Sequence, residues 1–405
     1  MKVKFLKLLM IISSLTSLIF LPGCWDRTEL NELSIVTGLG VDPGPTESEI
    51  TVVYQIVNPS AASGTQGVSS TMTPFMTLHT SGKTIYAAIR KSSREVSRKL
   101  YFGHLQVILI NSELAEKSGI KDLLDMMYRD PEIREDIPVA ITKGQKVDHV
   151  LSNQSILESN NALSILKHLD NTYETESCSR PVELREIINT LTSPSAEVVL
   201  PYIALSPYIS KSQLSETQDS SQASVIKAGG FAIFNNDKIV GYLEIKDARA
   251  LNFITDHIEK TVIVVPYKAN KQSIDLISSK TKRKASIKYG KPRIDLEIEI
   301  QANVGEANGP IDLTKVSTLA DLEKATNRTV KKEVEDVLGK IQKEFKVDAF
   351  RFGEVIERQH PKDWKTLKDN WEKEFVDLEV HVNVNTKIND IGMKNKSFQL
   401  EMKKK

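Results

Sequence analysis

Hydrophobic positions along the chain first gather in a leader at the amino terminus. Residues 8–20 are apolar apart from small hydroxyl side chains, and they follow Lys2, Lys4 and Lys7. A positive start, an apolar core and a small-residue cleavage region are typical of a secretory signal peptide. The apolar stretch is shorter than the roughly 20 residues that a membrane-spanning helix needs. We therefore predict that residues 1–23 are a cleaved signal peptide rather than an uncleaved anchor helix.

Residues 24–209 form the next region, in which short apolar strands alternate with helices. Residues 35–41 have the pattern of a buried strand, and the alternating residues 49–57 are predicted to pair with it as a hairpin. The order strand, helix, strand further along indicates a crossover unit in a mixed sheet, and this α/β region has room for two subdomains. The crossover has a strand over 105–110, a helix over 119–128 and a strand over 137–141; other helices are predicted over 84–99, 147–170 and 182–191.

Residues 210–224 are polar and rich in Ser and Gln, which predicts a linker. Residues 225–395 then have the pattern of an α+β domain with a largely antiparallel sheet backed by helices. We predict a hairpin over 230–243, strands over 262–265, 286–289, 294–300 and 378–384, and helices over 247–255, over 330–345 and around Trp364 and Trp371. Residues 396–405 form a basic tail. The predicted fold class is α+β, with mixed and antiparallel sheets backed by helices.

Composition narrows the possible partners. The net charge of the 405 residues is +1, which provides no field of one sign for binding nucleic acid. Hydrophobic residues make up 40% of the chain and charged residues 26%, as in ordinary globular proteins. Stability is therefore expected to come from packed cores.

Cys24 ends the sequence Leu21-Pro22-Gly23-Cys24, which resembles a bacterial lipobox. The resemblance implies that Cys24 takes a diacylglyceryl group and an N-acyl group, and becomes the first residue of the mature chain. Pro22 departs from the pattern, in which a small or hydroxyl residue is commoner. Because two acyl chains hold a protein on a membrane stably, this lipid needs no second anchor.

With Cys24 used by the lipid, Cys178 has no partner for an intramolecular disulfide. One interpretation of Cys178 is a reactive thiol or an intermolecular bridge. We favour a small buried side chain, because the carboxylates of Glu174 and Glu176 would raise the pKa of a nearby thiol.

No motif in the sequence supplies a catalytic, cofactor or metal site. Gly38-Leu39-Gly40 lacks the third glycine of a dinucleotide-binding loop and lies in a predicted strand, where glycines permit a bulge or a close backbone approach. The sequence has no HExxH, CxxC or Gly-x-Ser-x-Gly pattern. We therefore expect no enzymatic activity and no cofactor. Trp364 and Trp371, on one helical face, are expected to pack in the core rather than to anchor an interface.

The charged segment 129–136 is the one candidate for a partner surface. Arg129, Asp130, Glu132 and Arg134 interleave both signs at short spacing. They form either a docking surface or a solvated segment whose ion pairs each contribute less than about 1 kcal/mol. Asp130, followed by proline, also predicts the N-cap of a helical turn.

Four segments in order resemble the Ger(x)C family, the lipoprotein C subunits of nutrient germinant receptors in endospore-forming bacteria. Together they span nearly the whole mature chain, behind the lipobox. The segments are the mature start from Cys24-Trp25-Asp26-Arg27 to Asp42, residues 97–104 with 129–134, the hairpin 230–243, and residues 353–371 with Pro361, Trp364 and Trp371.

The resemblance implies a non-enzymatic receptor subunit with an elongated α/β fold in three domains. It implies a lipid-anchored position on the outer face of the cytoplasmic membrane, the spore inner membrane. The implied partners are a large A-type and a polytopic B-type membrane subunit, in a complex that senses nutrients and starts germination. The alternative is a substrate-binding lipoprotein of a transporter. The antiparallel pattern after residue 225 disfavours it, because that class has two doubly wound lobes around a ligand cleft.

Overall fold

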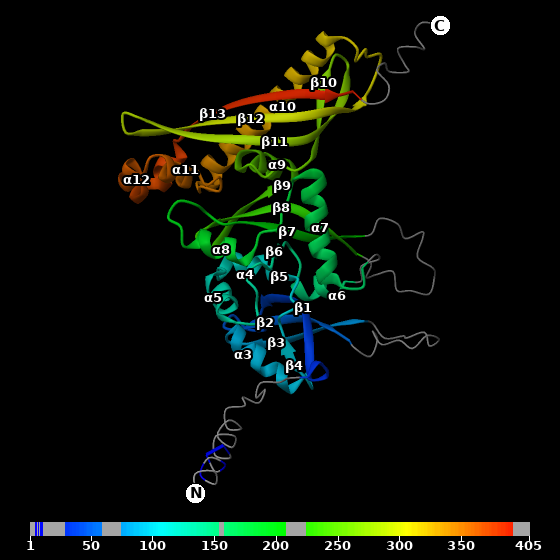
Figure 1. Cartoon of the computed structure of the whole chain (residues 1–405), viewed down its shortest axis with the longest axis vertical. Coiled ribbons are helices and arrows are strands. Elements are labelled where there is room, and N and C mark those ends of the chain that lie inside the picture. The colour runs from blue at the N-terminus through cyan, green and yellow to red at the C-terminus, as the bar shows by residue number, and fades with distance from the viewer. Residues whose placement is uncertain are drawn as a thin grey trace.

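The computed structural model describes residues 29–58, 74–153, 158–207 and 224–391, with Phe5, Lys7, Leu9 and Met10 of an amino-terminal helix. This part of the molecule is elongated, with two β-sheets placed one after the other along its long axis (Figure 1). The predicted linker lies outside the described residues except for Ser224, and so does the basic tail.

The first sheet has nine strands and a parallel centre. Parallel pairing joins β1 (Leu33–Pro43), β5 (Val107–Asn111), β6 (Val139–Thr142) and β7 (Val199–Pro207). Antiparallel strands flank them: β2 (Ile50–Val57) and β3 (Phe75–Gly82) beside β1, and β8 (Ser224–Asn235) and β9 (Lys238–Glu244) beside β7. The short β4 (Lys99–Tyr101) pairs with the start of β1. The predicted hairpin and the predicted crossover unit are both confirmed.

Helices cover both faces of the first sheet, so its central strands are apolar on both sides. Ile108 and Ile110 of β5 face one core, whereas Val107 and Leu109 face the other. One core is closed by α3 (Ile85–Lys91), α4 (Ser112–Lys117), α5 (Lys121–Arg129) and α8 (Leu184–Leu191), and the other by α6 (Val147–Ser152) and α7 (Asn161–Glu176).

The glycines of β1 allow α6 and α7 to approach the sheet closely. A Cβ on Gly40 would lie 2.0 Å from a methyl group of Val147, and Gly38 has similarly little space. The buried carboxylate of Asp42 then accepts hydrogen bonds from the N–H groups of Val147 (2.8 Å) and Asp148 (3.1 Å) at the start of α6. The predicted close backbone approach is therefore confirmed.

Asparagine side chains separate α6 from α7, where the sequence predicted one helix over 147–170. Asn161 donates a hydrogen bond to the carbonyl of Leu151 (2.7 Å), and Asn160 caps α7 by accepting one from the N–H of Leu163 (3.2 Å). Short amide side chains compete with helical hydrogen bonds in this way and interrupt the helix. The apolar spacing is helical on both sides of the interruption, which is why the sequence predicted a single helix.

The hairpin β8–β9 belongs to the first sheet, whereas the sequence pattern placed it in the carboxy-terminal domain. β8 pairs with β7, and its side chains alternate between two cores. Ala232 and Phe234 face a core of the first sheet, and Phe231 and Ile233 face the core under the second sheet. Because both faces of this hairpin are apolar, it joins the two halves of the molecule.

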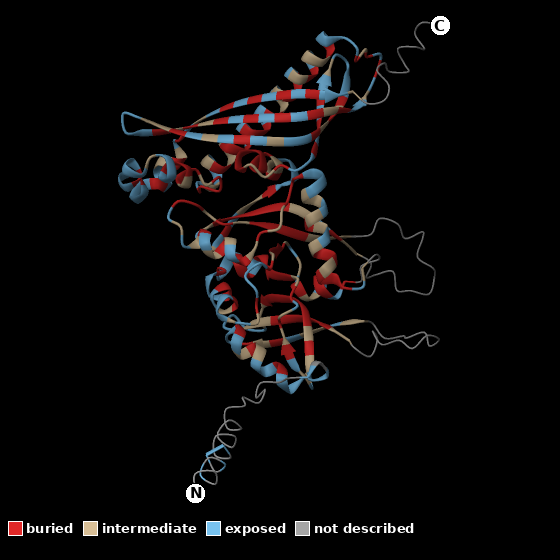
Figure 2. Cartoon of the chain, viewed as in Figure 1, coloured by how far each residue is buried: buried red, intermediate tan, exposed pale blue. Residues whose placement is uncertain are grey.

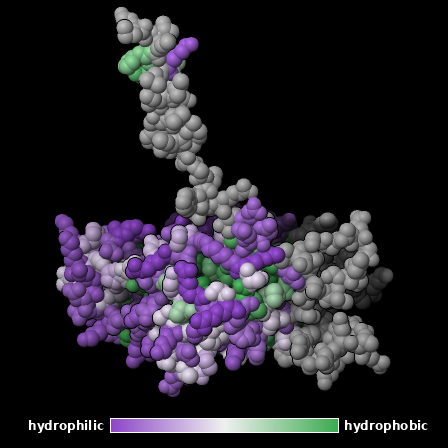
Figure 3. Space-filling model, turned by 90° about the horizontal axis from the view of Figure 1, so that it is seen from below, coloured by the Kyte–Doolittle hydropathy of each residue, from purple (hydrophilic) through white to green (hydrophobic). Residues whose placement is uncertain are grey.

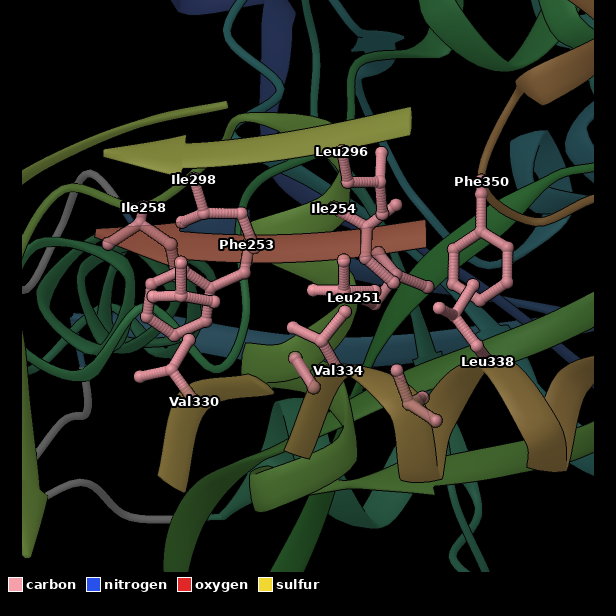
Figure 4. Close-up of a cluster of buried hydrophobic side chains, with 14 of the residues drawn as sticks. Leu251, Phe253, Ile254, Ile258, Leu296, Ile298, Val330, Val334, Leu338 and Phe350 are labelled. Carbon is pink, nitrogen blue, oxygen red and sulfur yellow. The ribbon is translucent and has the colours of Figure 1, made fainter. Parts of the chain in front are cut away.

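The second sheet has four strands in chain order, β10 (Thr261–Tyr267), β11 (Asn270–Lys288), β12 (Lys291–Ala307) and β13 (Glu379–Asp390). The first three are antiparallel, and β13 is parallel to β12. Helices α9 (Ile245–Thr255) and α10 (Val316–Lys340) cover one face. Figure 4 shows Phe253 of α9 between Ile298 of β12 and Val330 of α10. The other face is open, so buried and exposed residues alternate along these strands (Figure 2).

The connection from α10 to β13 consists of a π-helical turn (Ile341–Phe345), α11 (Phe352–Gln359), α12 (Pro361–Leu367) and α13 (Trp371–Val376). Trp364 and Trp371 are 3% and 5% exposed, and their rings meet edge to face at 5.3 Å. Their predicted place in the core is confirmed, although they lie on two helices.

Candidate functional site

The predicted lipid attachment site, Cys24, lies outside the described residues. After the amino-terminal helix, the described residues resume at Glu29, just before β1, and the start of β1 pairs with β4. Within the described part of the chain, no helix has both the length and the apolar character to cross a membrane.

Two arginines of the charged segment 129–136 form ion pairs with nearby carboxylates. Arg129 contacts Asp125 one helical turn earlier (2.8 Å), and Arg134 contacts Asp136 (3.0 Å). Their side chains are 76% and 68% exposed. Both arginines are therefore accessible to a partner.

The two acidic members, Asp130 and Glu132, hold the backbone instead. Asp130 accepts a hydrogen bond from the N–H of Glu132 (2.9 Å). Glu132 accepts one from the N–H of Phe102 (3.3 Å) and pairs with Lys99 (3.1 Å). The predicted turn with Asp130 as its cap is present: the N–H of Ile133 donates to the carbonyl of Asp130 (3.1 Å), which closes a single turn and buries Ile133 directly after α5.

Charged side chains that are buried or partly buried lie where the two halves meet, and no sequence pattern predicted them. Asp348, in the loop before α11, is 4% exposed. Its oxygens accept hydrogen bonds from the N–H groups of Phe352 (3.1 Å) and Gly353 (2.7 Å) and from Nε1 of Trp371 (3.0 Å). Burial raises the pKa of Asp348 to about 6 despite these donors. Asp348 thus fixes α11 against α13.

The same loop touches the first half of the molecule directly. A Cβ on Gly353 would lie 2.6 Å from the carbonyl oxygen of Ser195, so the close contact requires glycine. The N–H of Glu197 donates to the carbonyl of Asp348 (3.2 Å). Backbone contacts therefore hold the segment before β7 against the segment before α11.

A network of ion pairs lies where the two halves meet, and one of its pairs joins them. Arg180 donates to Glu186 of α8 (2.9 Å), and Arg351 lies 3.6 Å from Glu186 and 2.8 Å from Glu354. Burial acts to raise the pKa of Glu186, but the hydrogen bond from Arg180 and the charge of Arg351 lower it below its ordinary value. Glu186 is therefore a carboxylate bound by arginines from both halves.

A groove of about 430 Å³ opens beside these contacts. Glu197, Asp348 and Trp371 line it, together with the turn 368–373. Desolvation raises the pKa of Glu197 to about 7, although Glu197 accepts a hydrogen bond from the N–H of Asn236 (2.7 Å). Among the residues that the structure describes, no three His, Cys, Asp or Glu side chains are grouped to hold a metal ion. With its pKa raised to about 7, Glu197 can change its charge in this groove near neutral pH.

Cys178 is 1% exposed and lies near Glu176 (3.7 Å). Desolvation by burial, followed by the charge of Glu176, raises the pKa of the Cys178 thiol to about 12. The interpretation of Cys178 as a small buried side chain is confirmed.

The fold and the contacts between the halves define a class of protein: an elongated molecule of two unlike sheets joined by a shared hairpin and partly buried ion pairs. Two family models match it. The spore germination protein N-terminal domain matches residues 26–205, and "Spore germination B3/ GerAC like, C-terminal" matches residues 229–392. Together these matches take in most of the chain, and the chain belongs to this family of spore germination proteins.

Relatives match over nearly the full length. The chain is 28% identical over 404 residues to spore germination protein KC of Bacillus subtilis (strain 168), covering 98% of this chain and 99% of that protein. It is 26% identical over 380 residues to spore germination protein A3 of the same organism, covering 93% of this chain and 96% of that protein.

A solved structure has the same fold. The crystal structure of the GerBC protein superposes with a TM-score of 0.53 at 20% identity, covering 90% of this chain and 99% of that chain. The predicted combination of mixed sheets and helices is therefore confirmed.

Proposed function

We propose that this chain is a non-enzymatic lipoprotein subunit of a nutrient germinant receptor, needed for spore germination. It works by protein contacts at the outer face of the cytoplasmic membrane, the spore inner membrane, beside A-type and B-type membrane subunits. The observation that carries this proposal is the family match, which runs through both halves of the chain and continues nearly to the ends of relatives named as spore germination proteins.

The anchoring part of the proposal assigns the lipid to Cys24. Only four residues lie between Cys24 and Glu29, which comes just before β1 at the end of the elongated molecule that carries α3 and β4 (Figure 1). A lipid at Cys24 would hold that end at the membrane and leave the second sheet far from it.

The proposed partner surface includes the exposed arginines Arg129 and Arg134. Their own carboxylate pairs are exposed and therefore weak, so a partner carboxylate can replace them at little cost. Asp130 and Glu132 support this surface by fixing the turn between α5 and β6.

Deletion of the gene tests the receptor role. Spores without the protein should stop responding to one nutrient of an amino acid and sugar panel while still germinating with a trigger that bypasses nutrient receptors. Loss of optical density after each addition measures the response. A deletion strain that responds normally to every nutrient would contradict the proposal.

Matched cysteine variants test the anchor. Cys24→Ala should abolish incorporation of labelled palmitate and release the protein from the membrane fraction. Cys178→Ala, which changes the buried cysteine, should keep both palmitate and membrane retention. Palmitate incorporation that survives in Cys24→Ala would refute the assignment of the lipid.

A further inference from the structure

The end of the molecule nearest the amino terminus has a concentrated positive charge. The segment from Lys83 to Lys99 forms α3, a 3-10 turn and β4, and its six Lys and Arg side chains against the single carboxylate of Glu95 leave a formal charge of +5. Glu29 and Glu32 precede β1 nearby, and Glu132 pairs with Lys99; counting these three carboxylates leaves +2. The whole chain carries only +1, so positive charge gathers at this end.

Five of these cations have no carboxylate partner in the described part of the chain. This basic face consists of Lys83, Arg90, Lys91, Arg94 and Arg98. The first four are exposed and the last is half-buried, whereas the neighbouring Lys99 is paired with a glutamate. The basic face differs in this respect from segment 129–136, where both arginines have a carboxylate partner. An external anion can therefore approach the basic face without displacing a bound carboxylate.

Apolar side chains accompany the charge. Tyr86 is 54% exposed, and the guanidinium of Arg90 lies 5.0 Å from the centre of its ring. Met76, on the edge strand β3, is 45% exposed. Figure 3, which views this end from below, shows hydrophobic residues with hydrophilic residues around them. Tyrosine beside cations is the composition found at the headgroup level of membranes.

The basic face adjoins the start of the folded chain. β4 pairs with β1 so that Lys99 lies opposite Leu33, a few residues after Glu29. If Cys24 carries the lipid, as proposed above, the five residue steps to Glu29 span at most about 18 Å. Screening at physiological ionic strength acts over about 8–10 Å, so the tether keeps this end within or close to the reach of the membrane surface charge.

We propose that the basic face lies against the anionic headgroups of the membrane that holds the Cys24 lipid. This inference rests on the proposed anchoring. Charge complementarity and the short tether favour a lipid surface as the occupant, because the tether brings this end to the membrane whichever partner is present. The contact fixes the orientation of the long axis and presents the second sheet away from the bilayer.

The test uses the mature lipidated protein in vesicles of phosphatidylcholine alone or with a third phosphatidylglycerol. A water-soluble amine reagent and mass spectrometry measure how fast Lys83 and Lys91 are labelled. Lys282 and Lys332, exposed by 62% and 73% in the second half, serve as internal references. Labelling of Lys83 and Lys91 should be about fivefold slower in the anionic vesicles, with recovery at high salt and no change at the references.

Matched charge reversals distinguish the effect of a local contact with the membrane from the effect of the net charge of the protein. Arg90→Glu with Arg94→Glu should restore fast labelling of Lys83 and Lys91 in anionic vesicles. Lys324→Glu with Arg328→Glu, also exposed cations four residues apart, should leave them slow. Circular dichroism checks folding, and Arg90→Gln with Arg94→Gln replaces the first pair if it does not fold.

Equal labelling in both kinds of vesicle would overturn the inference while leaving the anchor intact. Slow labelling that appears only when the membrane subunits are added to phosphatidylcholine vesicles would assign the basic face to an acidic protein surface, and would also overturn it. An amino-terminal peptide whose mass shows no lipid on Cys24 would overturn the anchoring and this inference together.

Discussion

The two sheets of this molecule meet water in different ways. All five residues of β5 in the first sheet are buried, because helices cover both faces. In β12 of the second sheet, Leu296, Ile298 and Ile300 are buried, whereas Glu297 and Glu299 between them are exposed. The parallel centre of the first sheet needs crossover helices, which cover it, whereas antiparallel strands connect by tight turns and leave a face free.

The difference shows where each half gets its stability. The open face of the second sheet carries exposed ion pairs such as Lys282 with Glu299 (3.0 Å), which contribute little. Its other face depends on one layer of helices. Arg249 of α9 and Glu333 of α10, 17% and 7% exposed, are joined within that layer by two hydrogen bonds of 2.9 Å. The first half has two cores, and the second half depends on one.

A charge placed in the covered sheet should have the largest effect. Leu109→Asp puts a carboxylate into a core with no partner, and should lower the free energy of unfolding by more than about 4 kcal/mol. Glu297→Ala on the open face should change it by less than about 0.5 kcal/mol. Urea denaturation of the purified protein measures both, and Leu109→Ala, expected to cost about 2–5 kcal/mol, replaces Leu109→Asp if that variant does not fold. Similar losses of unfolding free energy for Leu109→Asp and Glu297→Ala would contradict the difference in burial between the two sheets.

Removal of one partner of the buried ion pair should have the next largest effect. Glu333→Ala leaves the Arg249 guanidinium buried and unpaired, and should cost about 3 kcal/mol in the same measurement. Arg249→Leu combined with Glu333→Leu should recover much of this loss, because no charge is left unpaired. Lys282→Ala, which breaks an exposed pair, should cost less than about 0.5 kcal/mol. A double variant as unstable as the single one would show that the ion pair itself holds the helix layer.

The smallest effect concerns the junction between the halves and depends on pH. Burial raises the pKa of Glu197 to about 7 from its ordinary 4.5, so the folded state binds this proton more tightly than the unfolded state. Its contribution to stability is therefore present at acidic pH and is lost as pH rises toward 7. Glu197→Gln should gain about 2 kcal/mol relative to wild type between pH 5 and pH 8, a little less than the full pKa shift implies because Glu197 is partly exposed to solvent.

Thermal unfolding of both proteins at the two pH values measures this gain. Glu335→Gln, which changes an exposed glutamate of α10, controls for the substitution. Asp348, whose pKa is raised in the same direction and whose charge acts on Glu197, remains in every variant, so the measured difference reports the two carboxyl groups together. A stability difference that does not vary with pH would show that Glu197 is solvated at the junction.

The elements with strong apolar periodicity could be predicted from the sequence. Two strands show this. The pattern of apolar residues in Val107–Asn111 and the alternation around Ile298 each fit only one strand assignment, because adjacent residues along the chain already indicate which sides are buried. Most of β11 was not predicted. Ile274 and Leu276 are buried near its start, but the later inward positions opposite β12 hold Thr281 and Ala285, which are too small or polar to mark an apolar face. Large side chains of the partner strand and of the helices fill the space beside Thr281 and Ala285.

The charges at the junction could not be predicted. Glu186 and Asp348 have no local pattern that distinguishes them from exposed carboxylates. Glu186 is partly buried because Arg351, 165 positions later, lies against it. Gly353 was part of a segment that carried the family resemblance, but its contact with Ser195 is not visible in the segment.

The sequence by itself determined many of the elements and the family resemblance. Apolar spacing is a property of neighbouring residues, and it was sufficient for the crossover unit, the long amphipathic helix and the position of most strands along the chain, whereas the order of strands in the sheets came from the structure. Only the tertiary structure decided that the hairpin β8–β9 completes the first sheet, and that the halves meet through partly buried charges. The physical reason is that the pairing of a two-faced strand and the ionisation of a carboxylate depend on which distant segments exclude water from them.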